Sequence, residues 1–162
     1  MLFAPLVIGY KLGWISGSVI RAAIVGYGFR GVDEAAVAAF GQRFAHDALP
    51  HVLRPEAMAR IQWHREQGDR VIVVSGALDI YLSHWCQTHG LELICTSLEA
   101  RDGRLTGRHR GRQCVGEEKA RRVRATLDLA SYPVIYAYGD TPEDRELLAL
   151  AHKRYYRWVE TA

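Results

Sequence analysis

The chain has 162 residues, of which 49% are hydrophobic and 24% are charged, and its formal net charge at pH 7 is +3. These values are ordinary for a globular domain, and the length is sufficient for one core with a small appendage. So small a positive excess does not call for a nucleic-acid partner, and it would not repel an anionic substrate.

Cysteine and histidine usage narrows the class further. Cys86, Cys95 and Cys114 are widely spaced and form no CxxC pair, and the seven histidines form no HExxH motif. This spacing argues against a disulfide scaffold and against a zinc site. It favours a reduced, cytoplasmic compartment.

The first 20 residues are apolar for most of their length. Lys11 and several glycines interrupt the run, and no basic segment precedes it. The segment is therefore a poor signal peptide and a poor transmembrane span. We expect a helix that packs on a neighbouring element, and contact with a membrane surface is the alternative.

Helical patterning continues to about residue 53. Asp33 is a candidate N-cap, and an apolar stripe of nearly helical spacing follows it at Val37, Phe40, Phe44 and Leu49. We expect no strand before residue 70. The sequence thus predicts a cap of two or three short helices in residues 1–53.

From residue 54 onward, helices alternate with strands. Pro55 and Gly68 bound a predicted helix, and the run "DRVIVVSG" that follows predicts a strand buried on both faces. Asp102-Gly103 predicts a hairpin turn. Further helices are expected at residues 77–90, 116–129 and 142–151, and further strands at residues 91–97, 133–139 and 153–158. This order predicts an α/β fold with a Rossmann-like parallel sheet in residues 54–162.

Polar residues stand where strands of this sheet end. One strand ends at Ser75-Gly76, another ends at Gly139-Asp140, and Lys119 lies in the first turn of a predicted helix. Ligand sites of open α/β sheets lie beyond the carboxyl ends of the strands, so these residues are expected to share one crevice. The N–H groups after Ser75 are expected at a helix N-terminus, which favours an anion.

The charges in this crevice suit a phosphate and a metal. Lys119 supplies a positive charge, and Asp140 offers hard oxygen ligands suited to Mg²⁺. Asp144 follows one helical turn after Asp140 and is expected to face the same cavity. Acids this close would repel one another without a metal and Lys119.

The segments "VIVVSGA", "GEEKARR" and "YAYGDTPEDRELL" together resemble the haloacid dehalogenase superfamily, in its phosphoserine-phosphatase-like branch, subfamily IB. The resemblance covers nearly the whole chain and implies a Mg²⁺-dependent phosphatase with a helical cap. It implies that Ser75 and the Gly76 N–H bind phosphoryl oxygens and that Lys119 neutralises charge. It further implies that Asp140 binds the metal and that Asp144 orders the metal shell and Lys119.

The sequence departs from this family in one respect. The family's first motif, DxDxT, supplies the nucleophilic aspartate and the acid–base aspartate, and no DxD occurs in this chain. Asp79 is no substitute, because we expect it inside the helix after Ser75. In the family, the strand bearing the motif lies between the strands that end at Ser75 and Gly139, so we expect unpaired edges there. We therefore expect an N-terminally shortened form of a longer hydrolase, with the motif upstream of Met1.

Each site residue has a plainer interpretation. Ser75 and Asp140 could be caps, and Asp144 could be an acid that suits a helix dipole. Lys119 could be a solvated helix residue, as we expect for Arg121, Arg122 and Arg124. The basic run at residues 101–114 could be a nucleic-acid patch, but it lacks interleaved aromatic residues, so a solvated face is expected.

Three functions remain open from the sequence. The first is a phosphomonoester hydrolase acting on a small phosphorylated substrate, where phosphoserine, another phosphate ester or a phospholipid head group are equally open. The second is a nucleophile-less, phosphate-ester-binding or regulatory protein without turnover. The third is a basic scaffold for nucleic acid or an acidic surface.

Overall fold

The computed structural model describes residues 15–161, so most of the predicted N-terminal apolar helix lies outside the described residues. The described part opens with helix α2 (Gly17–Gly28), which Ser16 caps, and helix α3 (Glu34–Asp47). The Asp33 carboxylate accepts a hydrogen bond from the Ala36 N–H at 2.9 Å, so the predicted N-cap is confirmed. A short 3₁₀ turn, η1 (Leu49–His51), ends the segment.

The buried face of α3 departs from the predicted stripe at one position, Phe40. Val37, Gly41 and Ala45 are its buried residues, whereas Phe40 is 60% exposed. An ideal Cβ at Gly41 would lie 1.8 Å from the Ile80 carbonyl oxygen. The row formed by Val37, Gly41 and Ala45 therefore faces the core, because the glycine in this row allows α3 to approach residue 80 closely.

The first βα unit follows the predicted order. Helix α4 (Pro55–Glu66) leads into strand β1 (Ile72–Leu78), helix α5 (Asp79–Thr88) and strand β2 (Glu92–Thr96), and β1 pairs with β2 in parallel. The predicted hairpin is confirmed as β3 (Leu98–Arg101) and β4 (Arg104–His109). Asp102 and Gly103 both have positive φ at its tip, as a tight hairpin turn requires.

The second part of the core begins with helix α6 (Glu117–Thr126). It continues through η2 (Leu129–Ser131), β5 (Tyr136–Gly139), η3 (Pro142–Asp144), α7 (Arg145–Leu148), β6 (Lys153–Tyr156) and β7 (Val159–Thr161). Strand β5 pairs with β6 in parallel, and β7 pairs with β6 in the antiparallel sense.

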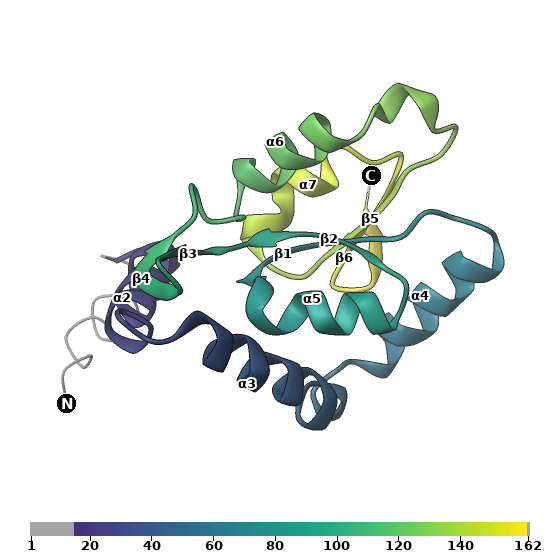
Figure 1. The fold of residues 1–162 in the computed structure, drawn as a ribbon. Helices are drawn as coiled ribbons and strands as arrows, with labels where there is room; N and C mark the ends of the chain where they lie inside the picture. Colours follow the sequence, from purple (N-terminus) through teal and green to yellow (C-terminus); the bar gives the residue numbers. More distant parts are fainter. Residues whose placement is uncertain (1–14, 162) are drawn as a thin grey trace.

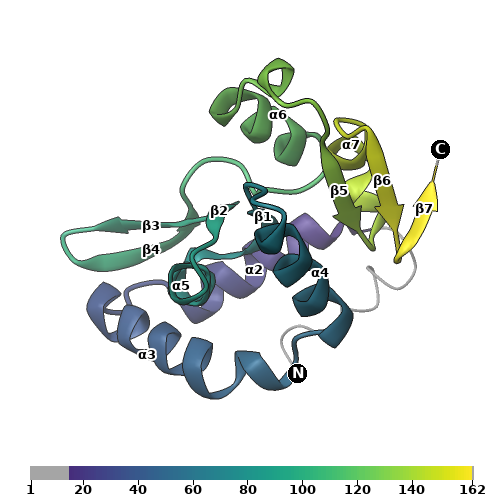
Figure 2. The same ribbon diagram turned by 90° about the vertical axis from the view of Figure 1, so that its right-hand side faces the viewer.

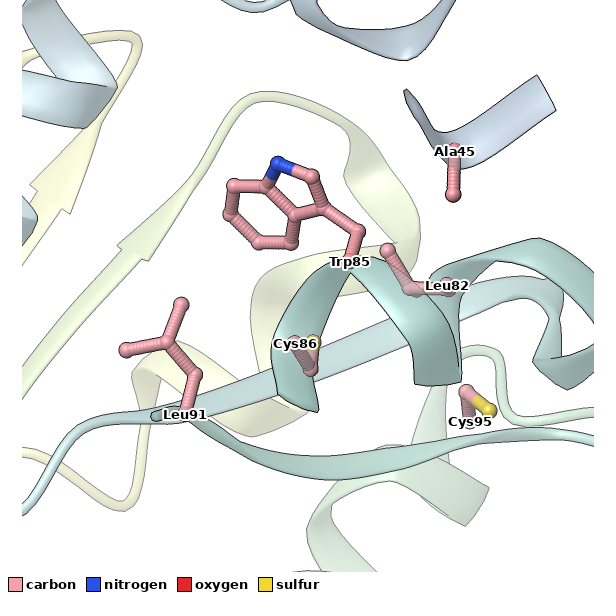
Figure 3. Close-up of a cluster of buried hydrophobic side chains, with 6 residues drawn as sticks. All are labelled: Ala45, Leu82, Trp85, Cys86, Leu91 and Cys95. Carbon is pink, nitrogen blue, oxygen red and sulfur yellow. The ribbon is translucent and has the colours of Figure 1, made fainter. Parts of the chain in front are cut away.

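Helices cover the strands on two sides. Figure 1 shows α4 and α5 on one side of β1 and β2, with α6 and α7 on the other. The main core cluster joins α3, α5 and β2 through Ala45, Leu82, Trp85, Cys86, Leu91 and Cys95 (Figure 3). A smaller cluster of Val25, Val37, Leu98 and Leu105 attaches the hairpin to α2 and α3. The predicted division of the chain at residue 53 stays a prediction.

The parallel strands form two separate sheets. Strands β1 and β2 make one, and β5, β6 and β7 make another, which Figure 2 shows side by side. A cavity of about 400 Å³ lies between them, lined mainly by apolar side chains of residues 71–74 and 134–138. The α/β prediction and the unpaired edges are confirmed for the described residues. Burial of β1 on both faces is wrong, since all its residues are only partly buried.

None of the helices between residues 15 and 161 combines the length and the apolar character that crossing a bilayer requires.

Candidate active site

The centre of the candidate site is the carboxylate of Asp144. One of its oxygens accepts a hydrogen bond from the Lys119 ammonium. The other accepts from the backbone N–H groups of Asp140 at 3.1 Å and Thr141 at 3.0 Å, and from the Thr141 hydroxyl at 2.8 Å. Asp144 is 5% exposed and Lys119 is 7% exposed. The structure thus brings three of the four predicted residues together in one hydrogen-bonded cluster.

Local sequence explains how Asp144 reaches this position. Thr141 and Asp144 form a reciprocal capping box, with Pro142 at the first position of η3. Gly139 allows the carboxylate to fold back over the strand end, because an ideal Cβ there would lie 2.5 Å from the Asp144 Cβ. The predicted helix at residues 142–151 is therefore shorter, a 3₁₀ turn followed by α7.

The electrostatic balance keeps Asp144 ionised. Burial by itself would raise the pKa of this carboxyl group, but hydrogen bonds from Lys119 and Thr141 outweigh burial and hold the pKa below its ordinary value. A buried carboxylate and a buried ammonium in direct contact form a neutral unit. Such a unit fixes the Lys119 side chain in one place.

The helix that carries Lys119 has a second buried charge. Glu118 is 3% exposed, and it accepts hydrogen bonds from Arg121 and Arg122. Arg122 also donates to the carbonyl groups of Cys95 and Arg112. The expectation that Arg122 is a solvated helix residue is therefore wrong, because it ties the start of α6 to β2. Lys119 is also buried rather than solvated.

Asp140 differs from Asp144 in exposure and in its partner. Its side chain is 45% exposed, and its Oδ2 lies 2.9 Å from a guanidinium nitrogen of Arg54. Its carbonyl oxygen accepts a hydrogen bond from Arg157 Nε at 3.2 Å. Asp140 is thus a carboxylate at the surface, held through its backbone.

Ser75 occupies a strand rather than a strand end. Strand β1 continues to Leu78, with a register shift after Ser75, and α5 begins at Asp79. The predicted helix N-terminus directly after Ser75 is therefore wrong. The Ser75 hydroxyl accepts a hydrogen bond from the Ala77 N–H at 3.1 Å. Across residues 15–161, no hydrogen bond joins Ser75 to the other three candidate residues.

Gly76 lies against the loop that leads to Lys119. An ideal Cβ at Gly76 would lie 2.8 Å from Cγ1 of Val115, so a side chain here would push that loop away. The loop is also tied to the acidic segment, because the Gly116 N–H donates to the Glu143 carbonyl oxygen at 3.0 Å. The three predicted motifs therefore meet through one loop.

Asp79 lies elsewhere. It is the first residue of α5 and lines a separate cavity of about 390 Å³, which it shares with Cys95, Arg121 and Arg122. None of the four candidate site residues lines that cavity. Asp79 is at the start of α5 rather than inside it, but it still does not belong to the Asp144 cluster.

The donor atoms suit a hard cation. Among the described residues, no group of three or more His, Cys, Asp or Glu side chains could hold a metal ion by itself. Both Asp144 oxygens are engaged, which leaves the Asp140 carboxylate. Mg²⁺ commonly binds through one or two carboxylates together with substrate phosphate and water. The donor set fits a Mg²⁺ ion shared with a phosphate. In this structure the Asp140 carboxylate forms an ion pair with the Arg54 guanidinium.

Sequence reasoning missed three residues that hold the acidic segment. Thr141 caps Asp144, and the spacing of Thr141 and Asp144 in "TPED" was a usable capping signal. Arg54 contacts Asp140, and Arg21 of α2 contacts the Glu143 carboxylate at 2.8 Å. No local pattern marks either arginine, because each contact joins segments far apart in sequence.

Comparisons with known proteins identify the family of the chain. A family model described as haloacid dehalogenase-like hydrolase matches residues 9–149. Two curated relatives, each called Protein CicA and from two strains of Caulobacter vibrioides, are 30% identical to the chain over 155 residues. Each match covers 94% of this chain and 69% of the relative.

Solved structures show the same fold. A crystal structure of a protein of unknown function from Bordetella pertussis Tohama I has a TM-score of 0.81 at 25% identity and covers 94% of this chain and 70% of its own. A HAD family hydrolase from Salmonella enterica serovar Typhi has a TM-score of 0.73 at 18% identity, covering 96% of this chain and 52% of its own. A probable phosphoserine phosphatase from Vibrio cholerae has a TM-score of 0.69 at 19% identity, covering 91% and 44%. At these last two identities the likeness concerns the fold.

Proposed function

The chain belongs to the haloacid dehalogenase-like hydrolases, and we propose that it supplies the phosphate-binding and Mg²⁺-binding part of a phosphomonoester hydrolase that acts on a small phosphorylated substrate. One observation carries this proposal. The buried Asp144, which pairs with Lys119, accepts a hydrogen bond from the backbone N–H of Asp140, whose carboxylate is half exposed, and a backbone hydrogen bond joins the segments that carry Lys119 and Asp144. Three buried, free thiols are compatible with the reducing cytoplasm as its compartment.

Lys119 is the proposed phosphate ligand on one side. An ammonium group has three donors, and Asp144 accepts from it. The remaining donors are available to a phosphoryl oxygen or to the attacking carboxylate. Because Asp144 is buried and ionised, it holds this ammonium in place through their hydrogen bond.

Ser75 and Gly76 are the proposed ligands on another side. The Ser75 oxygen accepts from the Ala77 N–H, so its own O–H remains a donor. The register shift after Ser75 takes the backbone out of regular pairing with β2. That irregularity supports the proposal that the Gly76 N–H and the Ser75 hydroxyl donate to phosphoryl oxygens.

Asp140 is the proposed metal ligand. A Mg²⁺ ion bound there would neutralise charge on the phosphoryl group. The protein's contribution is to present the carboxylate. The Asp144 oxygen that accepts from the N–H groups of Asp140 and Thr141 fixes this strand end, and the side chain stays open to solvent.

The nucleophile of the proposed reaction is not in this sequence, which contains no DxD. An aspartyl-phosphate mechanism needs an attacking carboxylate. We place it on a strand seated between β1 and β5. An apolar cavity of about 400 Å³ separates these strands, and within residues 15–161 no strand pairs with the edges that face it.

A second function is favoured by the same absence. A chain without the attacking carboxylate could bind phosphate esters and regulate without turnover, and the Lys119–Asp144–Asp140 cluster would serve that purpose equally well. Binding of phosphate is therefore common to both functions, and turnover separates them.

Calorimetric titration with inorganic phosphate, with and without Mg²⁺, tests the proposal. We expect Mg²⁺ to tighten phosphate binding, and Asp140→Asn to remove that gain. Ser75→Ala should weaken binding roughly tenfold, which corresponds to one hydrogen bond to a charged group. Ser83→Ala, on the exposed side of α5, is the matched control and should bind as the wild type does. Phosphate binding that ignores both Asp140 and Ser75 would contradict the proposal.

A further inference from the structure

The carboxylate proposed to bind Mg²⁺ already carries a cation from the protein. The Arg54 guanidinium lies 2.9 Å from Oδ2 of Asp140, and the two side chains are 58% and 45% exposed. The guanidinium is therefore ion-paired with one of the two carboxylate oxygens that a metal at Asp140 would use. This contact is unlike the Lys119–Asp144 pair, whose side chains are both less than a tenth exposed.

The backbone of Arg54 is fixed, whereas its side chain is long and solvated. Arg54 is the N-cap residue of α4, directly before Pro55, and its carbonyl oxygen accepts from the N–H groups of Ala57 and Met58 at 3.0 and 3.2 Å. Pro55 restricts the residue before it to extended backbone, which Arg54 has, with φ −77° and ψ 125°. The guanidinium is thus tethered beside Asp140 from a rigid helix start.

We infer that Arg54 is a tethered cation that competes with the divalent ion for Asp140 and so sets the affinity of the site for Mg²⁺. This inference rests on the proposed function, which assigns the metal to Asp140. Without metal, the guanidinium neutralises Asp140. When Mg²⁺ arrives, the guanidinium leaves the carboxylate, because two cations near one carboxylate repel each other.

The exposure of the pair makes this exchange easy. Ion pairs between exposed side chains contribute little net stability, because water solvates both partners when they separate. A buried pair in the same position would resist the metal, since separating it leaves a charge without a partner. The acidic segment therefore takes part in two different ion pairs. The buried pair at Asp144 is costly to separate, whereas the exposed pair at Asp140 separates at little cost in free energy.

A second arginine that pairs with the same acidic segment provides a matched control. Arg21 lies 2.8 Å from the Glu143 carboxylate, and these side chains are 35% and 41% exposed. Glu143 is three residues from Asp140 and is not a proposed ligand. Loss of Arg21 removes the same charge from beside this acidic segment without freeing Asp140.

The experiment measures binding of Mn²⁺ alone, by electron paramagnetic resonance of the free ion, with calorimetry of Mg²⁺ beside it. We expect Arg54→Gln to bind the ion about twofold to fivefold more tightly than the wild type, the range set by an exposed ion pair. Arg21→Gln should bind as the wild type does. Arg54→Lys, which keeps the charge, should stay close to wild type. Thermal unfolding without metal checks that each variant is folded.

The outcomes separate this inference from the proposed function. Equal tightening in Arg54→Gln and Arg21→Gln would show a general charge effect and overturn the inference, as would no change in Arg54→Gln. In both cases Asp140→Asn would still weaken binding, and the metal assignment would stand. If Asp140→Asn leaves Mn²⁺ binding unchanged, the metal assignment fails and the inference fails with it.

Discussion

The surroundings of Asp144 and the gap between strands β1 and β5 differ in how well their polar groups are paired. Around Asp144, both carboxylate oxygens are hydrogen-bonded and the paired ammonium of Lys119 is buried. Between β1 and β5, two strands face each other across an apolar cavity of about 400 Å³ and no hydrogen bond joins them. The charges around Asp144 are therefore paired and hydrogen-bonded within the described residues, whereas the sheet beside them has an edge without a partner strand.

The largest expected effect comes from removing the Lys119 ammonium that pairs with the buried Asp144. Lys119→Met should destabilise the fold by about 3–5 kcal/mol, because Asp144 then stays buried without its partner. Lys153→Met removes the exposed pair with Glu160, whose side chains are about half exposed, and should change stability by less than about 1 kcal/mol. Urea unfolding followed by circular dichroism measures both. Equal losses in the two variants would contradict the contrast.

A smaller loss of stability is expected from adding a side chain at Gly139, next to Asp144. Gly139→Ala should cost about 1–3 kcal/mol, because its methyl group would lie 2.5 Å from the Asp144 Cβ. Gly28→Ala, where nothing lies within 4 Å of the added carbon, is the control and should be neutral or stabilising. The same unfolding assay applies, and an undamaged Gly139→Ala protein would show that the strand end is loose.

A larger side chain is expected to change stability in opposite directions at the cavity between the sheets and in the packed interior beside α6. Ala57→Leu adds apolar volume at the cavity between the sheets and should stabilise the fold by up to about 1 kcal/mol. Ala120→Leu, at a position only 2% exposed on α6, should destabilise through overpacking. Thermal unfolding of the pair checks this. Destabilisation by both would mean that the cavity is not free to accept side chains.

The smallest expected effect concerns the acid limb of the stability curve. Hydrogen bonds from Arg121 offset burial and, with Arg122, lower the pKa of Glu118 to about 2. The ionised form is then favoured in the folded chain, so its stabilising contribution is complete above the ordinary pKa of 4.5 and disappears as the pH falls toward about 2. Glu118→Gln should flatten the fall in urea midpoint across this window. An unchanged slope would contradict the assignment.

Sequence reasoning succeeded where local chemistry decides the structure. The N-cap at Asp33, the helix start at Pro55 and the turn at Asp102-Gly103 lie where the sequence predicts them. It failed where a distant segment decides. Phe40 faces solvent because Gly41 takes the inner row of α3, and β1 continues past Ser75 because it pairs with β2 again at Leu78 after a register shift.

The candidate site divides in the same way. The acidic motif and the lysine of "GEEK" were recognisable because their spacing follows strand ends and first helical turns. Their burial was not, and neither was the Arg54–Asp140 contact, since a side chain 86 residues away in the chain has no local signature. The sequence predicted unpaired edges on the strands that end near Ser75 and Gly139, but the cavity between these strands is seen only in the structure.

The most direct test of the whole account is phosphate release in Mg²⁺, from phosphoserine and from a chromogenic aryl phosphate, by this chain with and without a synthetic apolar peptide that ends in Asp-x-Asp. The account predicts no release by the chain alone and Mg²⁺-dependent release with the peptide. Asp140→Asn, or an asparagine at the peptide's first aspartate, should abolish it. Equal release by the chain alone, or a peptide that neither binds nor restores turnover, would contradict the account.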